Sequence, residues 1–460
     1  MKARNLGRVV ACALLAPLAL VCGAQPAHAS GGVDQARFGS EDGHAAGATP
    51  FALYYNPAAL ALGGRMEVAG HLTLAWHGAT YNRTETTSPD PPMQPGANVG
   101  KATVSDVLAS PALALSYRVH DFVLGVGTYA PFAGMQSWSG GGHSYPQYPG
   151  TSDGSARWHF LEGGTSSLYA SMGGSYTIRP LRLSVGASAN LVYSKTEFTR
   201  AQNGSGDDNI TTEGRSYADV AGVTGSFGVG VLWEAIEKQL WFGVSYQAPP
   251  GLYKDISMDG KVRLLLGGVN PSESNVSLKQ AMPDIIRFAL RMRPMPRYEL
   301  RLFGDFTRWS VFERQCLVRN GGKCGLNADG SISAGSDAVL NQVRDWQNTF
   351  AIRAGGSYFF SPVWEGFAGI AYDGNAIPLS TLDASVIDGH DLTYTLGGRA
   401  RIADSFGVLL AVSYQHWLER DSTGKSRLDQ YKPPSRLPTS GGVYNQQAAV
   451  MNLMLEYHLR

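Results

Sequence analysis

Between Leu181 and Tyr193 apolar residues occupy seven successive alternate positions, and polar or small residues lie between them as far as Asn190. Because the side chains of a strand point alternately to its two faces, this segment predicts a strand with one apolar and one polar face. Strands of soluble sandwiches usually end after about five or six residues, whereas a tilted strand needs about nine to eleven to cross a membrane. The segment is therefore long enough to span a bilayer. Its apolar face consists of Leu181, Leu183, Val185, Ala187, Ala189, Leu191 and Tyr193.

The same alternation recurs along most of the chain, and the connections alternate in length. Short connections such as His120-Asp121, Arg179-Pro180 and Ser361-Pro362 are followed by connections that are mostly long and polar. Short turns at one end and long loops at the other are typical of outer-membrane barrels, in which the short turns face the periplasm. The pattern predicts 14 strands: one ends at the Arg179-Pro180 turn, and the others cover residues 68–76, 113–119, 122–129, 181–193, 217–233, 240–266, 284–292, 298–309, 346–360, 363–373, 392–401, 406–417 and 447–459.

Composition favours a barrel over soluble domains. Charged residues make up 16% of the chain, and Gly (56), Tyr (21) and Trp (9) are abundant, whereas soluble proteins usually have about a quarter charged residues. The predicted fold class is all-β membrane: a 14-stranded antiparallel transmembrane β-barrel with a small N-terminal helical hatch in the lumen. Two aromatic girdles are predicted, formed by Trp233, Trp241 and Trp364 near short turns and by Trp76, Trp309, Trp346 and Trp417 near long loops.

The N-terminus has the pattern of an export signal. Basic residues up to Arg8 precede an apolar run from Val9 to Gly23, and Ala27-His28-Ala29 is a small-residue cleavage site. We predict that residues 1–29 form a signal peptide. Lipidation at Cys22 is disfavoured because the preceding Val21 is bulky. The mature chain is close to neutral, so no nucleic-acid partner is expected, and the barrel-assembly machinery of the outer membrane is an expected partner.

The segment from Ala46 to Ala61 is the one helical interruption of the strand pattern. It is rich in Ala, and Asn56-Pro57-Ala58 lies in its middle. Proline is favoured in the first turn of a helix and Asn is a natural cap in front of it. We therefore predict two short helical pieces broken at Pro57, within a hatch of residues 30–65 that precedes a barrel of residues 66–460.

Two cysteines remain after removal of the signal peptide. Cys316 and Cys324 flank a short polar turn, so we predict a disulfide in the oxidising compartment outside the cytoplasm. A metal site would need more ligands nearby, and neither a metal nor another cofactor is expected.

Several of these segments together resemble the FadL-type outer-membrane transporters of long-chain fatty acids and other hydrophobic compounds. The resemblance lies in Asn56-Pro57-Ala58, in the run Gly125–Gly134, in Ala281–Asp284 with Gly304–Phe312, and in Asp345–Tyr358 with Ala368–Asp373, which recur in the family's order. The matches cover most of residues 30–417. The chain departs from barrels of this kind at its C-terminus, where Arg460 stands in place of an aromatic residue.

The resemblance implies a route of loop capture, binding in the lumen and lateral release through a gap in the wall. The gap lies at a kink in the third strand beside the hatch, which the resemblance maps to Gly125 or Gly127. The moving part of the hatch would include Asn56, Pro57 and Ala58. Outer-membrane lipid would receive the ligand, and the family suggests a monomer.

Ligand-binding candidates come from the loops and the lumen. Apolar capture is predicted for Phe132, Met135, Trp138, Tyr145, Tyr148 and Trp158, with packing between loops or contact with lipid as the alternatives. Alternation places Arg287, Arg291 and Arg301 on the lumen side, where a guanidinium can bind a carboxylate through two parallel hydrogen bonds. The alternative is that these charges pair with acids such as Asp305 across a polar lumen.

The expected function is passive uptake of hydrophobic small molecules, foremost long-chain fatty acids. The alternatives are an aromatic-hydrocarbon transporter of the same fold, a general diffusion porin, and an adhesin or assembly protein. The hatch argues against an open porin. An enzyme is not expected, because no nucleophile elbow and no phosphate-binding loop is found in the sequence.

Overall fold

The computed structural model describes residues 43–90, 94–140, 144–265, 270–319, 321–403 and 405–459. The predicted signal peptide and the first part of the predicted hatch, residues 30–42, lie outside the described residues. Within the described part, no helix is both long enough and apolar enough to cross a membrane.

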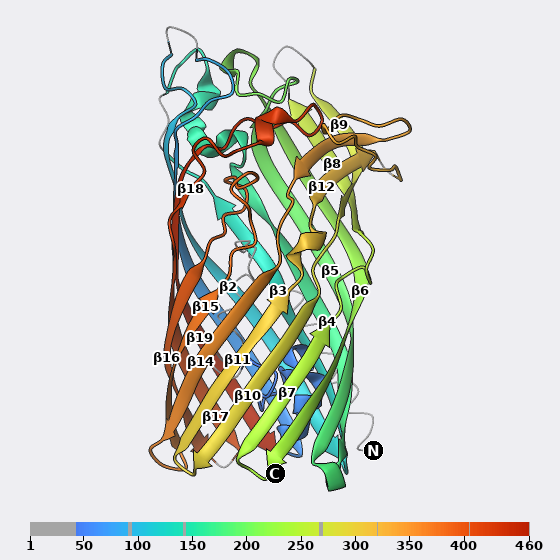
Figure 1. Ribbon diagram of the computed structural model, residues 1–460, viewed down its shortest axis with the longest axis vertical. Coiled ribbons are helices and arrows are strands. Elements are labelled where there is room, and N and C mark those ends of the chain that lie inside the picture. Colours follow the sequence, from blue (N-terminus) through green and yellow to red (C-terminus); the bar gives the residue numbers. More distant parts are fainter. Residues whose placement is uncertain are drawn as a thin grey trace.

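Fourteen antiparallel strands form a closed barrel, which confirms the predicted fold class (Figure 1). The first strand pairs with the last from Met66↔Leu459 to Arg83↔Gly442, and this pairing closes the wall. The C-terminal strand therefore forms although the chain does not end in an aromatic residue. The wall strands are β1 (Met66–Arg83), β2 (Gly100–Val119), β3 (Phe122–Ser137), β4 (Glu162–Ile178), β5 (Leu183–Gln202), β6 (Gly214–Ile236), β7 (Leu240–Gln247), β10 (Ile285–Met295), β11 (Tyr298–Thr307), β14 (Thr349–Phe359), β15 (Trp364–Asp373), β16 (Asp391–Ala403), β17 (Phe406–Trp417) and β19 (Gly442–Leu459).

Shorter strands extend the wall beyond the barrel at the end that carries the long loops. The upper part of β6 pairs with β8 (Ile256–Leu265), and the sheet continues through β9 (Ser272–Gln280) and β12 (Arg314–Arg319) to β13 (Ala338–Val343). A two-residue strand, β18 (Arg420–Asp421), joins β19. A disulfide joins Cys316 of β12 to Cys324.

The prediction of one strand over residues 240–266 is wrong. The chain forms β7 and β8 as separate strands, and both pair with β6. Pro249 and Pro250 follow the end of β7, and proline has no N–H to donate to a neighbouring strand. The strand count remains correct because β8 continues the wall above β7.

The wall has an apolar outer face and a mostly polar inner face. In β5, Val185, Leu191 and Tyr193 are exposed, whereas Ser188 and Asn190 are buried inside. The girdle prediction is correct for Trp233 and Trp364, which are exposed at the short-turn end. It is wrong for Trp241, Trp309, Trp346 and Trp417, which are all buried.

The hatch consists of two short helical pieces, α2 (Ala52–Tyr55) and the 3-10 helix η4 (Pro57–Leu62). Figure 1 shows them inside the lower part of the barrel, near the short-turn end. The residues from Ala45 to Leu60 are almost all buried against the inner wall. An aromatic cluster joins Tyr54 of the hatch to Tyr129 of β3 and Tyr169 of β4.

Candidate functional site

Asn56 ties the hatch to the wall. Its side-chain Nδ2 donates to the carbonyl of Ala45 at 2.7 Å and to that of Val231 in β6 at 3.0 Å, and its Oδ1 accepts from the N–H of Ala58 at 3.1 Å. Pro57 follows as the first residue of η4. Asn56 and Ala58 are completely buried. The predicted hatch residues therefore lie at the contact between plug and wall.

Inward-facing glycines make this contact possible. A Cβ on Gly186 of β5 would lie 2.3 Å from the backbone N of Ala58, and a Cβ on Gly243 of β7 would lie 2.1 Å from the carbonyl O of Ala45. Neither glycine was among the predicted site residues. Gly186 stands on the polar, inward side of the alternation in β5. This position is the sequence feature from which its contact with the hatch could have been predicted.

We expect Gly186→Val to displace the hatch, because the new side chain would overlap the hatch backbone. Passage of small sugars into liposomes that contain the variant should rise several-fold over the wild type. The control is Gly70→Val in β1, since a Cβ there has no atom within 4 Å. Equal sugar permeability in both variants, with both barrels folded, would contradict a tightly docked hatch.

The wall is interrupted beside the hatch, between β2 and β3. The two strands pair from Val119↔Phe122 to Leu113↔Thr128, and above this point one bridge is found among the described residues, between Thr103 and Ser139. On the other side of β3, pairing with β4 shifts register between Tyr129 and Phe132, where Ala130 and Pro131 stand opposite one β4 residue, Leu168. The irregularity is thus a bulge that carries one extra residue.

The predicted position of the kink, at Gly125 or Gly127, is wrong. Both glycines are regularly paired with β2 and β4. A Cβ on Gly125 would lie 3.2 Å from Cδ1 of Leu60 in the hatch, and a Cβ on Gly127 would lie 3.2 Å from Cβ of Ala114. Gly125 therefore lets the hatch approach the wall, and the bulge comes at Ala130-Pro131.

The three arginines predicted to bind a carboxylate lie inside the barrel near the short-turn end, each with a partner. Arg287 donates to the carbonyl of Tyr54 at 3.3 Å and lies over its ring. Arg291 and Arg301 each contact Glu299 at 2.9 Å.

Further ion pairs extend this contact around the inner wall, and we call the series the charge belt. Arg301 reaches Glu365 at 3.4 Å, Glu365 pairs with Arg399 at 3.2 Å, and Arg399 pairs with Glu456 at 3.3 Å. His458 lies 3.7 Å from Glu456 and 3.2 Å from Glu67, whose carboxylate accepts from the N–H of Gly64 at the end of the hatch. The charge belt comprises Arg291, Glu299, Arg301, Glu365, Arg399, Glu456, His458 and Glu67.

A cavity lies at the long-loop end, above the bulge. Its volume is about 50 Å³, and its walls come from β3, β4 and β5, from the added strands β9, β12 and β13, and from the loop before β16. Apolar side chains dominate the lining and two arginines join them. The lining side chains that matter here are Met135, Phe160, Phe198, Arg200, Leu278, Leu317, Leu340, Arg344 and Val386.

The two arginines of this cavity differ in their partners. Arg344 contacts Asp383 at 3.5 Å and donates to Gln315 from both Nε and Nη2. Arg200 is 3% exposed, and within the described part of the chain neither a hydrogen bond nor an ion pair to its guanidinium is found. It also lines a second, outer groove of about 300 Å³ beside Arg436. Arg200 is therefore a buried cation placed between two cavities, and it was not among the predicted residues.

The predicted aromatic and sulfur-containing residues divide into two groups. Met135 lines the cavity, and Phe132 lies just beyond the bulge, 6.5 Å from the ring of Tyr169 and 6.2 Å from that of Trp309. Trp138 and Trp158 are buried within the loops, as the alternative interpretation expected. Their indole N–H groups donate to the carbonyl of Ala384 and to Asn98, and Tyr145 and Tyr148 pack beside Trp158.

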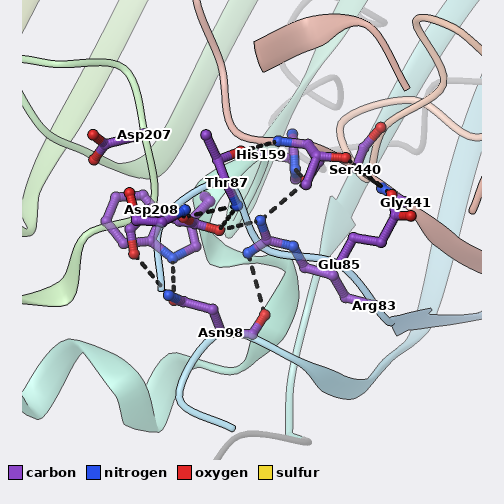
Figure 2. A network of polar contacts seen from close by, with 12 residues as sticks. Arg83, Glu85, Thr87, Asn98, His159, Asp207, Asp208, Ser440 and Gly441 are labelled. Carbon is purple, nitrogen blue, oxygen red and sulfur yellow. Dashed lines mark hydrogen bonds and ion pairs between the residues drawn. The ribbon is translucent and has the colours of Figure 1, made fainter. Parts of the chain in front are cut away.

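A buried polar network holds the long loops together above the cavity (Figure 2). Arg83 at the end of β1 contacts Asp208 at 2.6 Å and donates to the carbonyls of Asn98 and Thr439. Asn98 in turn donates to the carbonyl of Asp208 at 2.7 Å. His159 lies 3.3 Å from the carbonyl O of Thr439. Four loops distant in sequence are therefore joined into one cap.

We expect acid to loosen this cap through His159. Burial lowers the pKa of His159 to about 4, against the charge of Asp383, which raises it. Since the unfolded chain has the ordinary histidine pKa of about 6.5, the contribution of His159 to stability is complete above pH 6.5. It is lost as the pH falls from there to about 4. The protection of residues 144–161 against hydrogen exchange, relative to the intrinsic rate at each pH, should therefore fall in this window, and less so in His159→Gln. An equal loss of protection in the variant would contradict the assignment.

Comparison with known proteins agrees with this geometry. A family model described as outer membrane protein transport protein (OMPP1/FadL/TodX) matches residues 23–456. Curated protein sequences yield no match. A FadL homologue from Pseudomonas aeruginosa aligns at a TM-score of 0.74 and 16% identity, over 95% of this chain and all of the other.

Two further solved structures share the fold. The toluene transporter TodX from P. putida aligns at a TM-score of 0.62 and 15% identity, over 89% of this chain and 94% of the other. The toluene transporter TbuX from Ralstonia pickettii aligns at 0.60 and 17%, over 93% and 98%. Since the family model covers nearly the whole sequence, the chain belongs to the OMPP1/FadL/TodX family of outer-membrane transport proteins.

Proposed function

We propose that this protein is a passive uptake channel for long-chain fatty acids in the outer membrane. The observation that carries the proposal is the apolar cavity with Arg200 at its wall. Among the described residues Arg200 has no ion pair; its guanidinium lies 6.0 Å from the centre of the Phe198 ring, and the charge of Asp383 acts on it without direct contact. A ligand carboxylate would give this buried cation a direct ion pair, while the acyl chain contacts Met135, Phe198 and Leu317. A neutral hydrocarbon would leave Arg200 without one.

Release is proposed to be lateral, through the interruption between β2 and β3. The bulge at Ala130-Pro131 lies next to Phe132, and the hatch lies on the short-turn side of it. Below, the charge belt lines the inner wall in the periplasmic part of the lumen, and an acyl chain that passed there would have to desolvate its ion pairs. Burial of the chain in the bilayer stabilises the released ligand by about 0.8 kcal/mol per CH₂ group, so no energy source is needed.

An aromatic-hydrocarbon transporter is the second candidate. Trp309, Phe312 and Trp346 form a buried cluster of rings with centroid distances of 4.5–6.1 Å, and Phe132 extends the cluster towards the bulge. Two of the compared structures are toluene transporters.

The proposal has two further parts: the protein acts as a monomer, and the barrel-assembly machinery inserts it into the outer membrane.

The test compares uptake of labelled oleate, toluene and a small sugar by cells with the wild type and with a variant that lacks residues 46–61. The proposal is supported if the wild type takes up oleate and the uptake falls in the variant while its barrel stays folded. If the cells take up toluene but not oleate, the protein is a hydrocarbon transporter that uses the same route. Free passage of the sugar through the wild type would identify a porin and contradict both candidates.

A further inference from the structure

A second crevice lies at the opposite end of the barrel, at its periplasmic rim. It has a volume of about 640 Å³ and is formed by the β10–β11 turn, the β14–β15 turn and the end of β16. No residue of the proposed uptake route lines it. Its lining combines arginines with large apolar side chains.

The arginines give the crevice an unbalanced positive charge. Arg399 is paired with Glu365 and Glu456 of the charge belt, and Arg293 lies 4.4 Å over the ring of Phe359. Arg297 and Arg401 are exposed, and within the described residues neither side chain has a hydrogen bond or an ion pair. Two solvated guanidinium groups therefore face the crevice, and none of the described residues supplies a counter-ion to them.

The apolar side of the crevice faces lipid. Phe360, Val363 and Trp364 are 65%, 44% and 60% exposed, and Ile402, next to Arg401, is 66% exposed. Aromatic side chains with neighbouring arginines are typical of the level where lipid headgroups meet the acyl chains. The lining thus offers cations to a headgroup and an apolar surface to the chains attached to it.

The charge belt decides from which side a ligand can enter. Glu365 and Arg399 line the crevice and at the same time belong to the belt, so ion pairs separate the crevice from the lumen above. An amphiphile that reaches the crevice without breaking these pairs comes from the periplasmic leaflet of the surrounding membrane.

We propose that this rim crevice binds the phosphate of a glycerophospholipid from the periplasmic leaflet. Arg297 and Arg401 contact the phosphate oxygens, a geometry in which guanidinium groups are effective. Phe360, Trp364 and Ile402 contact the acyl chains. The site goes beyond the proposed transport function and does not depend on the identity of the transported ligand.

The experiment is native mass spectrometry of the detergent-purified protein after exchange with phosphatidylglycerol. We expect one retained lipid on the wild type, and about tenfold less retention in Arg297→Gln/Arg401→Gln, because each basic residue near a membrane surface strengthens the binding of an anionic lipid. The matched control is Arg179→Gln/Arg182→Gln at another short turn, whose arginines already pair with Asp121 and Glu237. The control should retain lipid like the wild type.

Competition separates the possible sources of the phosphate. Glycerol phosphate and inorganic phosphate should displace the lipid poorly, since they lack acyl chains. Displacement at equal concentration would reduce the crevice to a simple anion site and overturn the proposal, as would equal retention in wild type and double variant. Oleate uptake by the double variant should match the wild type. A matching loss of oleate uptake would assign the crevice to the transport route and also overturn the proposal.

Discussion

Replacing Arg200 by glutamine will weaken the binding of oleate by about thirty-fold and that of toluene by about fivefold at most. A hydrogen bond to a charged group contributes about 2 kcal/mol, which corresponds to the larger factor. Toluene offers Arg200 no hydrogen-bond acceptor but only a ring face, and such a contact contributes about 0.5–1 kcal/mol. The effect is large because the cation is buried, where water cannot replace the lost partner.

The same substitution should raise the stability of the ligand-free barrel. Arg200 is a buried charge for which the described residues provide no ion pair, and removing such a charge relieves its desolvation penalty. Arg344→Gln is the matched control, because it leaves the buried carboxylate of Asp383 without its ion-pair partner and should lower stability.

Titration of each variant with a fluorescent fatty acid, followed by thermal unfolding, measures both quantities. Weaker oleate binding with an unchanged or higher Tm supports Arg200 as the carboxylate anchor. Equal losses for oleate and toluene would show a general collapse of the cavity. Unchanged oleate binding would remove Arg200 from the site and favour the hydrocarbon alternative.

The barrel could be predicted because its main determinant is local. Alternation with a period of two depends on neighbouring residues alone, and it assigned the apolar and polar faces of β5 correctly. The error over residues 240–266 had a local signal that alternation alone does not weigh, namely two consecutive prolines. The error for Trp241 arose because its nearness to a turn was used instead of its position in the alternation: Trp241 lies on the inward side of β7, whereas Phe242 and Val244 are exposed. Trp309 and Trp346 lie outside the wall strands, where alternation gives no face.

The site was harder to predict because partners depend on the register between strands. The alternation placed Arg301 on the inner face correctly. Its contact with Glu365, however, joins two residues that are 64 positions apart in the sequence, and the alternation within one strand does not predict such a contact. Arg200 also stands on the inward side of the alternation in β5. What distinguishes it is that no described residue forms an ion pair with it, and this depends on how the loops pack in three dimensions. The kink shows the same limit, since glycines suggested a bend whereas the structure has an inserted residue at Ala130-Pro131.

Deleting Pro131 will reduce oleate uptake to the background level while the barrel remains folded. Between the last regular pair, Leu113↔Thr128, and the bridge Thr103↔Ser139, the chain that includes β3 has ten residues, 129–138, and β2 has nine, 104–112. The chain of β3 is thus one residue longer than its partner. Removing one residue equalises the two lengths and also removes the bulge opposite Leu168, so β2 and β3 can pair along their full length.

Pro131→Ala separates the effect of the extra residue from that of the missing N–H. It restores a hydrogen-bond donor but keeps the surplus residue, so the register stays shifted and uptake should remain close to the wild type. Oleate binding to the purified deletion variant should also remain, because Arg200 and the cavity lie on the long-loop side of the bulge. Binding without uptake would identify the wall opening as the exit. Normal uptake by the deletion variant would instead direct the ligand past the hatch, and the charge belt, which a fatty acid would then have to cross, becomes the next target for substitution.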